Sequence, residues 1–114
     1  MNRCAATTVA LLAILALGAR SARAQAPNPQ RERARYVLEV HCGMCHREDS
    51  PRVQQKALAV YNLNEIDWAA RMSAAQLGAA RDRLDGLGEA SEADRKVFAE
   101  FVASELARRA RPPR

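Results

Sequence analysis

The chain has 114 residues, and its 18 lysine and arginine residues against 13 aspartate and glutamate residues give a formal net charge of +5. This length suits one small domain. Aromatic residues make up only 4% of the chain, which is too few for the stacking platforms that bind single-stranded nucleic acid. No nucleic-acid-binding motif accompanies the positive charge, so the composition argues against a nucleic-acid partner.

Residues 1–24 have the three-part pattern of a secretory signal peptide. Arg3 supplies a positive start, residues 9–18 form an apolar segment too short to cross a bilayer, and residues 22–24 (Ala-Arg-Ala) form a small-x-small cleavage site. Cleavage there leaves 90 residues with a formal net charge of +2 and removes Cys4. We therefore expect an exported, periplasmic protein with no stable membrane span after cleavage.

A proline-containing flexible leader, residues 25–30, precedes the first predicted helix, at about residues 31–40. Ala34, Val37 and Leu38 fall on one side of this helix at helical spacing. The helix leads directly into the sequence Cys-Gly-Met-Cys-His at residues 42–46.

The sequence at residues 42–46 places two cysteines three residues apart and a histidine directly after the second. This spacing is typical of covalent c-type haem attachment. Each thiol can add to one vinyl group of the porphyrin, and the histidine can bind the iron as its proximal ligand. We predict one haem c, attached through Cys42 and Cys45 and ligated by His46. The signal peptide carries the thiols out of the cytoplasm, where they must meet the haem.

Other uses of a Cys-x-x-Cys pair remain as alternatives. A structural zinc site needs four ligands, and His41, Cys42, Cys45 and His46 have suitable side chains but are crowded into six residues. A thioredoxin-like redox pair needs βαβ surroundings, and no strands are predicted. A disulfide or two free thiols is the remaining alternative in an exported chain.

The middle of the chain is predicted to be short and partly irregular. A short helix is expected over residues 53–61, then a turn at residues 62–64 and an irregular segment or single helical turn at residues 65–71. The irregular segment carries Trp68, the single tryptophan. We interpret the charged residues around it as part of a solvated loop, without a catalytic role. These charged residues are Glu65, Asp67 and Arg71.

Two further helices are predicted after this segment. Ser73 followed by Gln76 is a capping-box pattern that begins a helix running to about residue 84, and residues 86 and 88 offer glycine for a left-handed C-cap. Ser91 is the expected N-cap of the last helix, which extends to about residue 109. The apolar stripe of that helix comprises Val97, Phe98, Phe101, Val102 and Leu106.

Met72 is the candidate for the sixth iron ligand. After cleavage only Met44 and Met72 remain, and Met44 lies inside the attachment sequence on the proximal side. Met72 follows His46 by 26 residues and precedes a helix cap, and Met/His is a standard ligand pair of electron-transfer cytochromes. Core packing is the alternative role of Met72. We expect His41 to be a surface or structural residue rather than a ligand.

These residues resemble the small monohaem c-type cytochromes of class I type. The resemblance rests on a first helix that ends at Cys42-x-x-Cys45-His46, a downstream Met72 and an amphipathic last helix. It implies an all-α, cytochrome c-like domain over residues 31–110, wrapped around one covalently bound haem, and a disordered tail at residues 111–114. It also implies that the first and last helices cross tightly, with Ala34 receiving an aromatic residue, Phe98 or Phe101. The short interval between His46 and Met72 and the serine after Met72 depart from the family's pattern.

The resemblance implies an electron carrier rather than an enzyme. Its partners would be redox proteins and the machinery that attaches haem. Two alternatives remain: a cytochrome c subunit of a larger oxidoreductase, and a haem protein with an open sixth site for gas binding or peroxidase-like chemistry.

Overall fold

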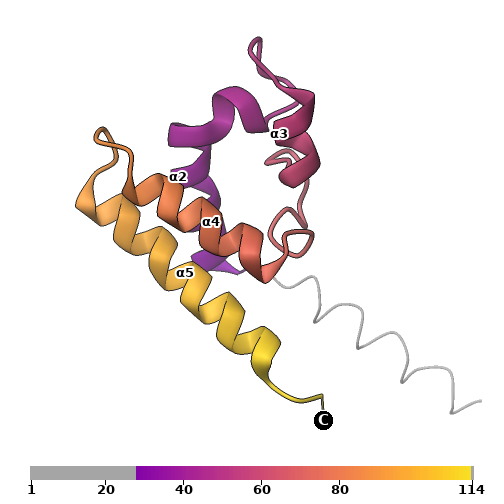
Figure 1. Ribbon diagram of the computed structural model, residues 1–114, viewed down its shortest axis with the longest axis vertical. Helices are drawn as coiled ribbons and strands as arrows, with labels where there is room; N and C mark the ends of the chain where they lie inside the picture. Colours follow the sequence, from indigo (N-terminus) through magenta and orange to yellow (C-terminus); the bar gives the residue numbers. More distant parts are fainter. Residues whose placement is uncertain (1–27, 114) are drawn as a thin grey trace, which may run out of the picture.

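Four α-helices make up most of the structure, a computed structural model that describes residues 28–113. They are α2 (Pro29–His46), α3 (Gln55–Val60), α4 (Ala74–Asp85) and α5 (Glu92–Ala110), and no strand occurs in this part of the chain (Figure 1). The all-α prediction is confirmed for these residues. None of these helices is long and apolar enough to cross a membrane. The predicted signal peptide, residues 1–24, lies outside the described residues.

Helix α2 extends beyond the predicted helix at both ends. Asn28 is its N-cap, and the Asn28 Oδ1 atom accepts hydrogen bonds from the backbone N–H groups of Gln30 (3.0 Å) and Arg31 (3.2 Å). Pro29 occupies the first helical position, where its fixed φ favours the helix. This cap starts the helix inside the stretch expected to be a flexible leader. At its other end the helix continues through His46, so the whole Cys-Gly-Met-Cys-His sequence of residues 42–46 is helical.

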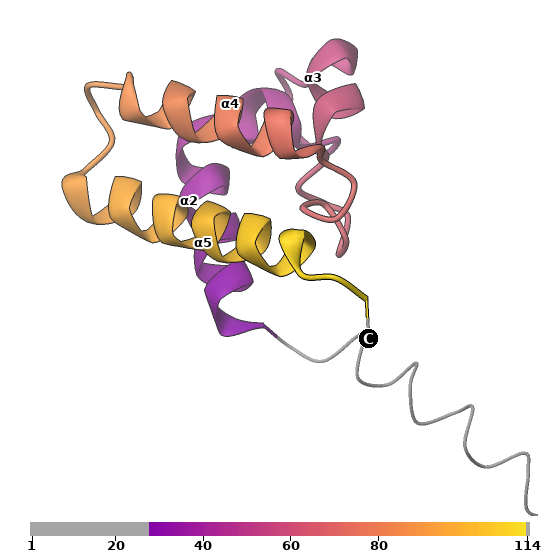
Figure 2. The same ribbon diagram turned by 60° about the horizontal axis from the view of Figure 1, so that its bottom comes forward.

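Helices α4 and α5 form an antiparallel pair joined by a short connection, and α2 crosses behind them (Figure 2). The predicted capping box of α4 is confirmed: Gln76 N donates to Ser73 Oγ (3.1 Å), and Ser73 N donates to Gln76 Oε1 (2.9 Å). Ser91 caps α5 as predicted, with its Oγ accepting from Asp94 N (3.0 Å). Gly86 at the end of α4 has φ −80° and ψ −10°. The C-cap is therefore right-handed, not left-handed, and does not need glycine.

The hydrophobic core lies between α2, the residue 61–72 segment and the α4–α5 pair. Ala34 of α2 is fully buried, as are Phe98 and Phe101 of α5, and α2 packs directly against α5. The Trp68 ring lies 5.6 Å from the Phe101 ring between centroids, so the middle segment joins the same core. The predicted stripe of α5 is confirmed, with three members buried and two partly buried: Phe98, Phe101 and Val102, then Val97 and Leu106.

Replacing Ser73 by alanine is expected to destabilise the protein by about 1 kcal/mol, because the first turn of α4 loses the side chain that accepts from Gln76 N. Urea denaturation followed by circular dichroism measures this loss. Ser104→Ala is the matched control, because Ser104 is an exposed residue within α5 and its substitution should change the free energy of unfolding by less than about 0.5 kcal/mol. Equal effects of the two substitutions would contradict the role of the cap.

Candidate cofactor-binding site

The Cys-Gly-Met-Cys-His sequence, residues 42–46, occupies the last turn of α2. Cys42, Cys45 and His46 stand at positions i, i+3 and i+4, which are neighbours on one face of a helix. All three side chains are half-buried, whereas Met44 is exposed. The helix therefore presents two thiols and an imidazole together, which the sequence spacing alone did not require.

The geometry weakens the zinc, thioredoxin-like and disulfide alternatives for the two cysteines, and it leaves the alternative of two free thiols open. Across residues 28–113, no three His, Cys, Asp or Glu side chains come together as a metal-binding group, which argues against the zinc site. Cys42 and Cys45 are free thiols, not a disulfide. The described chain also lacks the strands that a thioredoxin-like pair requires.

The loop after α2 holds the end of the Cys-Gly-Met-Cys-His sequence in place. The last carbonyl groups of a helix have no partner within the helix, and here three of them accept hydrogen bonds from later residues. The bonds run from Ser50 Oγ to Met44 O (2.7 Å), from Gln54 N to Cys45 O (3.3 Å) and from Leu63 N to His46 O (2.9 Å). The backbone of the motif is thus anchored to residues up to 17 positions away.

His46 is oriented by Tyr61. The His46 Nδ1 atom lies 3.1 Å from the Tyr61 carbonyl oxygen, and the two rings stack with centroids 3.7 Å apart and planes within 1°. A carbonyl oxygen can only accept, so Nδ1 carries the proton that is donated to it. Burial lowers the pKa of His46, which favours the neutral ring. The Nε2 lone pair is then free to bind a metal, and a carbonyl behind the ring is the usual way proteins orient a metal-binding histidine.

Cys42 faces the same tyrosine. Burial raises the pKa of the Cys42 thiol, and a hydrogen bond with the Tyr61 side chain partly opposes this effect. Cys42 is therefore a protonated thiol at neutral pH. Tyr61 contacts both Cys42 and His46, so a single residue 15 positions beyond the motif supports two of its three functional side chains.

A cavity of about 460 Å³ opens beside Cys42 and His46. This volume lies within the range of cofactor and small-molecule sites. Its walls come from α2, from α3 and its flanks, and from α4, with Cys42, His46, Gln54, Lys56, Ala57, Val60, Tyr61, Gln76, Ala79, Ala80 and Arg83 as lining residues. Small and apolar side chains line much of it, and the exposed cations Lys56 and Arg83 lie on its α3 and α4 walls.

The structure separates Met72 from the other predicted site residues. The Met72 side chain is only 1% exposed and belongs to the hydrophobic core, and it does not line the cavity. Cys45 also lies outside the cavity lining, although it shares the helix face of Cys42 and His46. The cavity therefore brings together Cys42 and His46, and the core holds Met72.

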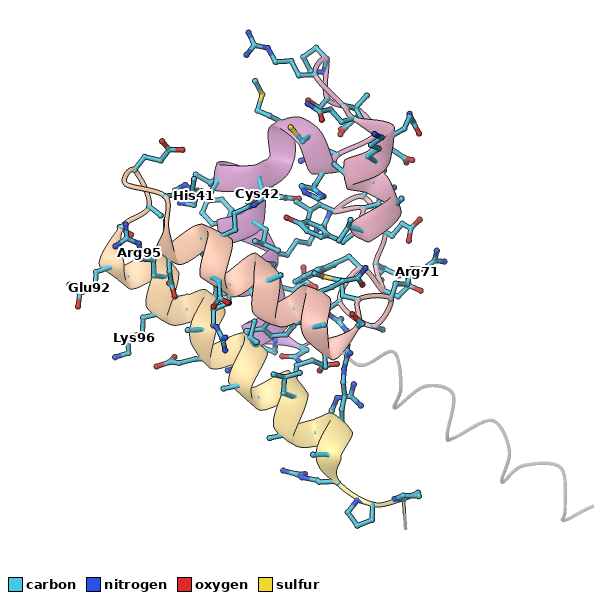
Figure 3. All side chains as sticks on the ribbon, viewed as in Figure 1. His41, Cys42, Arg71, Glu92, Arg95 and Lys96 are labelled. Atoms are coloured by element: carbon cyan, nitrogen blue, oxygen red, sulfur yellow. The ribbon has the colours of Figure 1, made fainter. Side chains whose placement is uncertain are left out.

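His41 connects two helices. Its Nε2 atom lies 2.9 Å from Asp94 Oδ2, so the start of the motif on α2 is tied to the first turn of α5. Figure 3 shows His41 and Cys42 side by side on α2, with Arg71 projecting outward on the other side of the molecule. The structural role expected for His41 is confirmed. Arg71 pairs with Glu65 (3.0 Å) and Asp67 (3.1 Å) at the surface, as expected for a solvated charged loop.

The sequence interpretation missed the α4 wall of the cavity. Gln76, Ala79, Ala80 and Arg83 are spaced by three, one and three residues, which places them on one face of a helix. Two small residues between two polar residues on one helix face could have indicated that this face of α4 lines a cavity. Tyr61 gave no comparable signal, because its contact with His46 depends on the path of the intervening loop.

Two thiols, a neutral imidazole, small apolar walls and cations are the chemical groups that the site offers. These groups can bind a metal through the imidazole and pair with anionic groups through the cations. Comparison with known proteins found no matching family model, curated protein or solved structure.

Proposed function

We propose that the protein is an exported monohaem c-type cytochrome that transfers single electrons. The observation that carries this proposal is the shared helix face of Cys42, Cys45 and His46 beside a cavity that Cys42 and His46 line. The cavity volume of about 460 Å³ and its small apolar walls are compatible with a haem. The hydrogen bond of His46 Nδ1 to Tyr61 O, which leaves the proton on Nδ1 and a lone pair on Nε2, supports an iron ligand at this position.

Each residue of the site has a distinct role in this proposal. Cys42 and Cys45 form the two thioether bonds, and His46 binds the iron through Nε2 while Tyr61 O holds its Nδ1 proton. Lys56 and Arg83 supply positive charge for the two haem propionates. When bound, the haem supplies reversible one-electron oxidation and reduction.

Met72 is the proposed sixth ligand. The side chain lies in the core and outside the cavity lining, so ligation requires its thioether to turn from the core toward the cavity. Methionine is suited to such a change because its side chain is unbranched and has three rotatable bonds. Met/His ligation is also the pair associated with a raised reduction potential in cytochromes c.

A haem protein with an open sixth site is the second candidate function. It is favoured by the α4 wall, where Gln76, Ala79, Ala80 and Arg83 line the cavity and Met72 does not. Such a site would accept a gas molecule or a peroxide. The two candidates make opposite predictions for a Met72 variant.

Replacing Met72 by alanine is expected to lower the reduction potential by on the order of 100 mV, part of the roughly 0.8 V range that axial ligands span. The variant should also lose the weak charge-transfer band of ferric Met–Fe ligation at the red end of the visible spectrum. A redox titration with absorption spectroscopy measures both. High-spin ferric features and rapid carbon monoxide binding in the unaltered protein, with no change in the variant, would instead support the open site.

The proposal implies a periplasmic location, a haem-attachment machinery and at least one redox partner protein. The same chemistry serves a free carrier or a subunit of a larger oxidoreductase. Purifying the protein from its native cells, from the soluble fraction and from the membrane fraction separately, distinguishes the two. Only a subunit co-purifies in stable stoichiometry with a catalytic protein.

A further inference from the structure

An exposed apolar stripe runs along α2. Its members, Tyr36, Val40 and Met44, are 66%, 56% and 53% exposed. They stand at positions i, i+4 and i+8, which share one face of a helix. The described residues have two other exposed large hydrophobic side chains, Val60 and Ile66, and neither lies on α2. Contiguous exposed apolar surface, unlike single scattered residues, marks interaction sites, so this face of α2 is a candidate interface.

An open groove of about 380 Å³ lies beside the N-terminal end of the stripe, between α2 and α5. Tyr36 and Val37 of α2 and Val97 of α5 form its apolar walls, and Arg33 lies at its rim. Its other lining residues are Glu32 and Asp94. The groove can therefore receive an apolar side chain next to a positive charge.

The stripe and the groove are self-complementary about Val40. Tyr36, beside the groove, precedes Val40 by four residues, and Met44 follows it by four. When a second copy of α2 packs antiparallel with the two Val40 residues in contact, Met44 of each copy lies opposite the groove of the other. Each contact of a two-fold interface occurs twice in this way. The flexible, unbranched side chain of methionine suits an open apolar groove.

The charges at the two ends of the stripe match in the same arrangement. Arg33 and Glu48 are both exposed, and neither forms an ion pair within residues 28–113. Glu48 accepts a hydrogen bond from Asn62 Nδ2 at 3.3 Å. Antiparallel packing brings Arg33 opposite residues 47 and 48 of the second copy. Arg47, the like charge there, is already paired with Asp49 at 2.7 Å, so the carboxylate of Glu48 is the group available to Arg33.

We propose that this face of α2 is the interface of a homodimer, in which two stripes pack antiparallel about Val40 and Met44 of each copy enters the groove of the other. The inference goes beyond the proposed function and does not depend on a bound haem. One helix face per copy makes a small contact, of the weak class that buries less than about 1,200 Å². Cys42 lies two residues from both Val40 and Met44, on another face of the helix, so the dimer leaves the cavity open.

Sedimentation equilibrium of the purified protein between about 10 µM and about 1 mM, the range of weak association, tests this inference. The mass should rise from monomer to dimer. Val40→Glu places two carboxylates together at the two-fold axis and should raise the dissociation constant by about tenfold or more, because like charges in an interface are unfavourable. Ile66→Glu is the matched control, since it makes the same kind of change at an exposed apolar residue outside the stripe, and it should leave the dissociation constant unchanged.

Charge reversal tests the antiparallel register. Arg33→Glu and Glu48→Arg should each raise the dissociation constant by about threefold or more, because each sets like charges opposite one another twice. The double variant restores opposite charges and should recover most of the lost affinity. Far-ultraviolet circular dichroism of every variant shows whether it is folded.

Three results would overturn the inference. A protein that stays monomeric over the whole concentration range leaves the stripe to a different partner. A dimer that a folded Val40→Glu protein retains, or that Ile66→Glu weakens equally, uses another surface. A double charge variant that dimerises no better than either single variant contradicts the pairing of Arg33 with Glu48 and so the antiparallel register.

Discussion

If the protein carries the proposed haem, replacing His46 by alanine is expected to abolish its low-spin spectrum while leaving the thiols of Cys42 and Cys45 in place. His46 is the single imidazole on the cavity wall, and its Nε2 atom has the free lone pair. Added imidazole should restore the low-spin spectrum, because it can occupy the space the side chain leaves. Absorption spectroscopy of ferric and ferrous protein measures this, with haem stain per polypeptide recorded separately.

His41→Ala is the matched control for this experiment. His41 is the other histidine of the chain, and its Nε2 atom is engaged with Asp94. Losing that hydrogen bond should cost about 1 kcal/mol of stability and leave the spectrum unchanged. A His46→Ala protein with the unaltered spectrum, or a His41→Ala protein that loses it, would contradict the ligand assignment.

Replacing Phe98 by alanine is expected to destabilise the protein by about 3–5 kcal/mol, the range observed for large-to-small substitutions of buried aromatic residues. Phe98 is fully buried in α5, the helix that packs against both α2 and α4. Small domains have only about 5–15 kcal/mol of stability in total, so this one change removes a large share. Urea denaturation followed by circular dichroism measures the loss.

Tyr36→Ala is the control for the Phe98 substitution. Tyr36 is also aromatic and also lies on the α2 side of the molecule, but its side chain is 66% exposed. Its removal should change the free energy of unfolding by less than about 0.5 kcal/mol. Comparable losses at Phe98 and Tyr36 would show that the buried core to which Phe98 belongs is not the main source of stability.

The three long helices could be predicted because their signals are local. Ser73 with Gln76 and Ser91 with Asp94 form caps within four residues, and the α5 stripe repeats at the helical period. The start of α2 was placed too late because the prolines at residues 27 and 29 were interpreted as a leader. Pro29 is in fact a favourable first helical residue behind the Asn28 cap.

The parts of the site that could not be predicted depend on contacts between distant residues. The carbonyl of Tyr61 meets His46 only because the loop between them folds back, and Arg109 meets Met72 only after α5 has packed. No periodicity or short spacing encodes such contacts. The sequence could indicate Cys42, Cys45 and His46 as a candidate site, since their spacing is contained in one turn of α2.

Covalent attachment of one haem through Cys42 and Cys45 is the central claim, and the intact mass of the purified mature protein tests it most directly. The proposal predicts a mass equal to the cleaved polypeptide plus one haem, with haem stain that survives a denaturing gel. The double variant Cys42→Ala and Cys45→Ala should have the polypeptide mass alone and no stain. A mature protein produced alongside a haem-attachment machinery that has the polypeptide mass alone would contradict the claim.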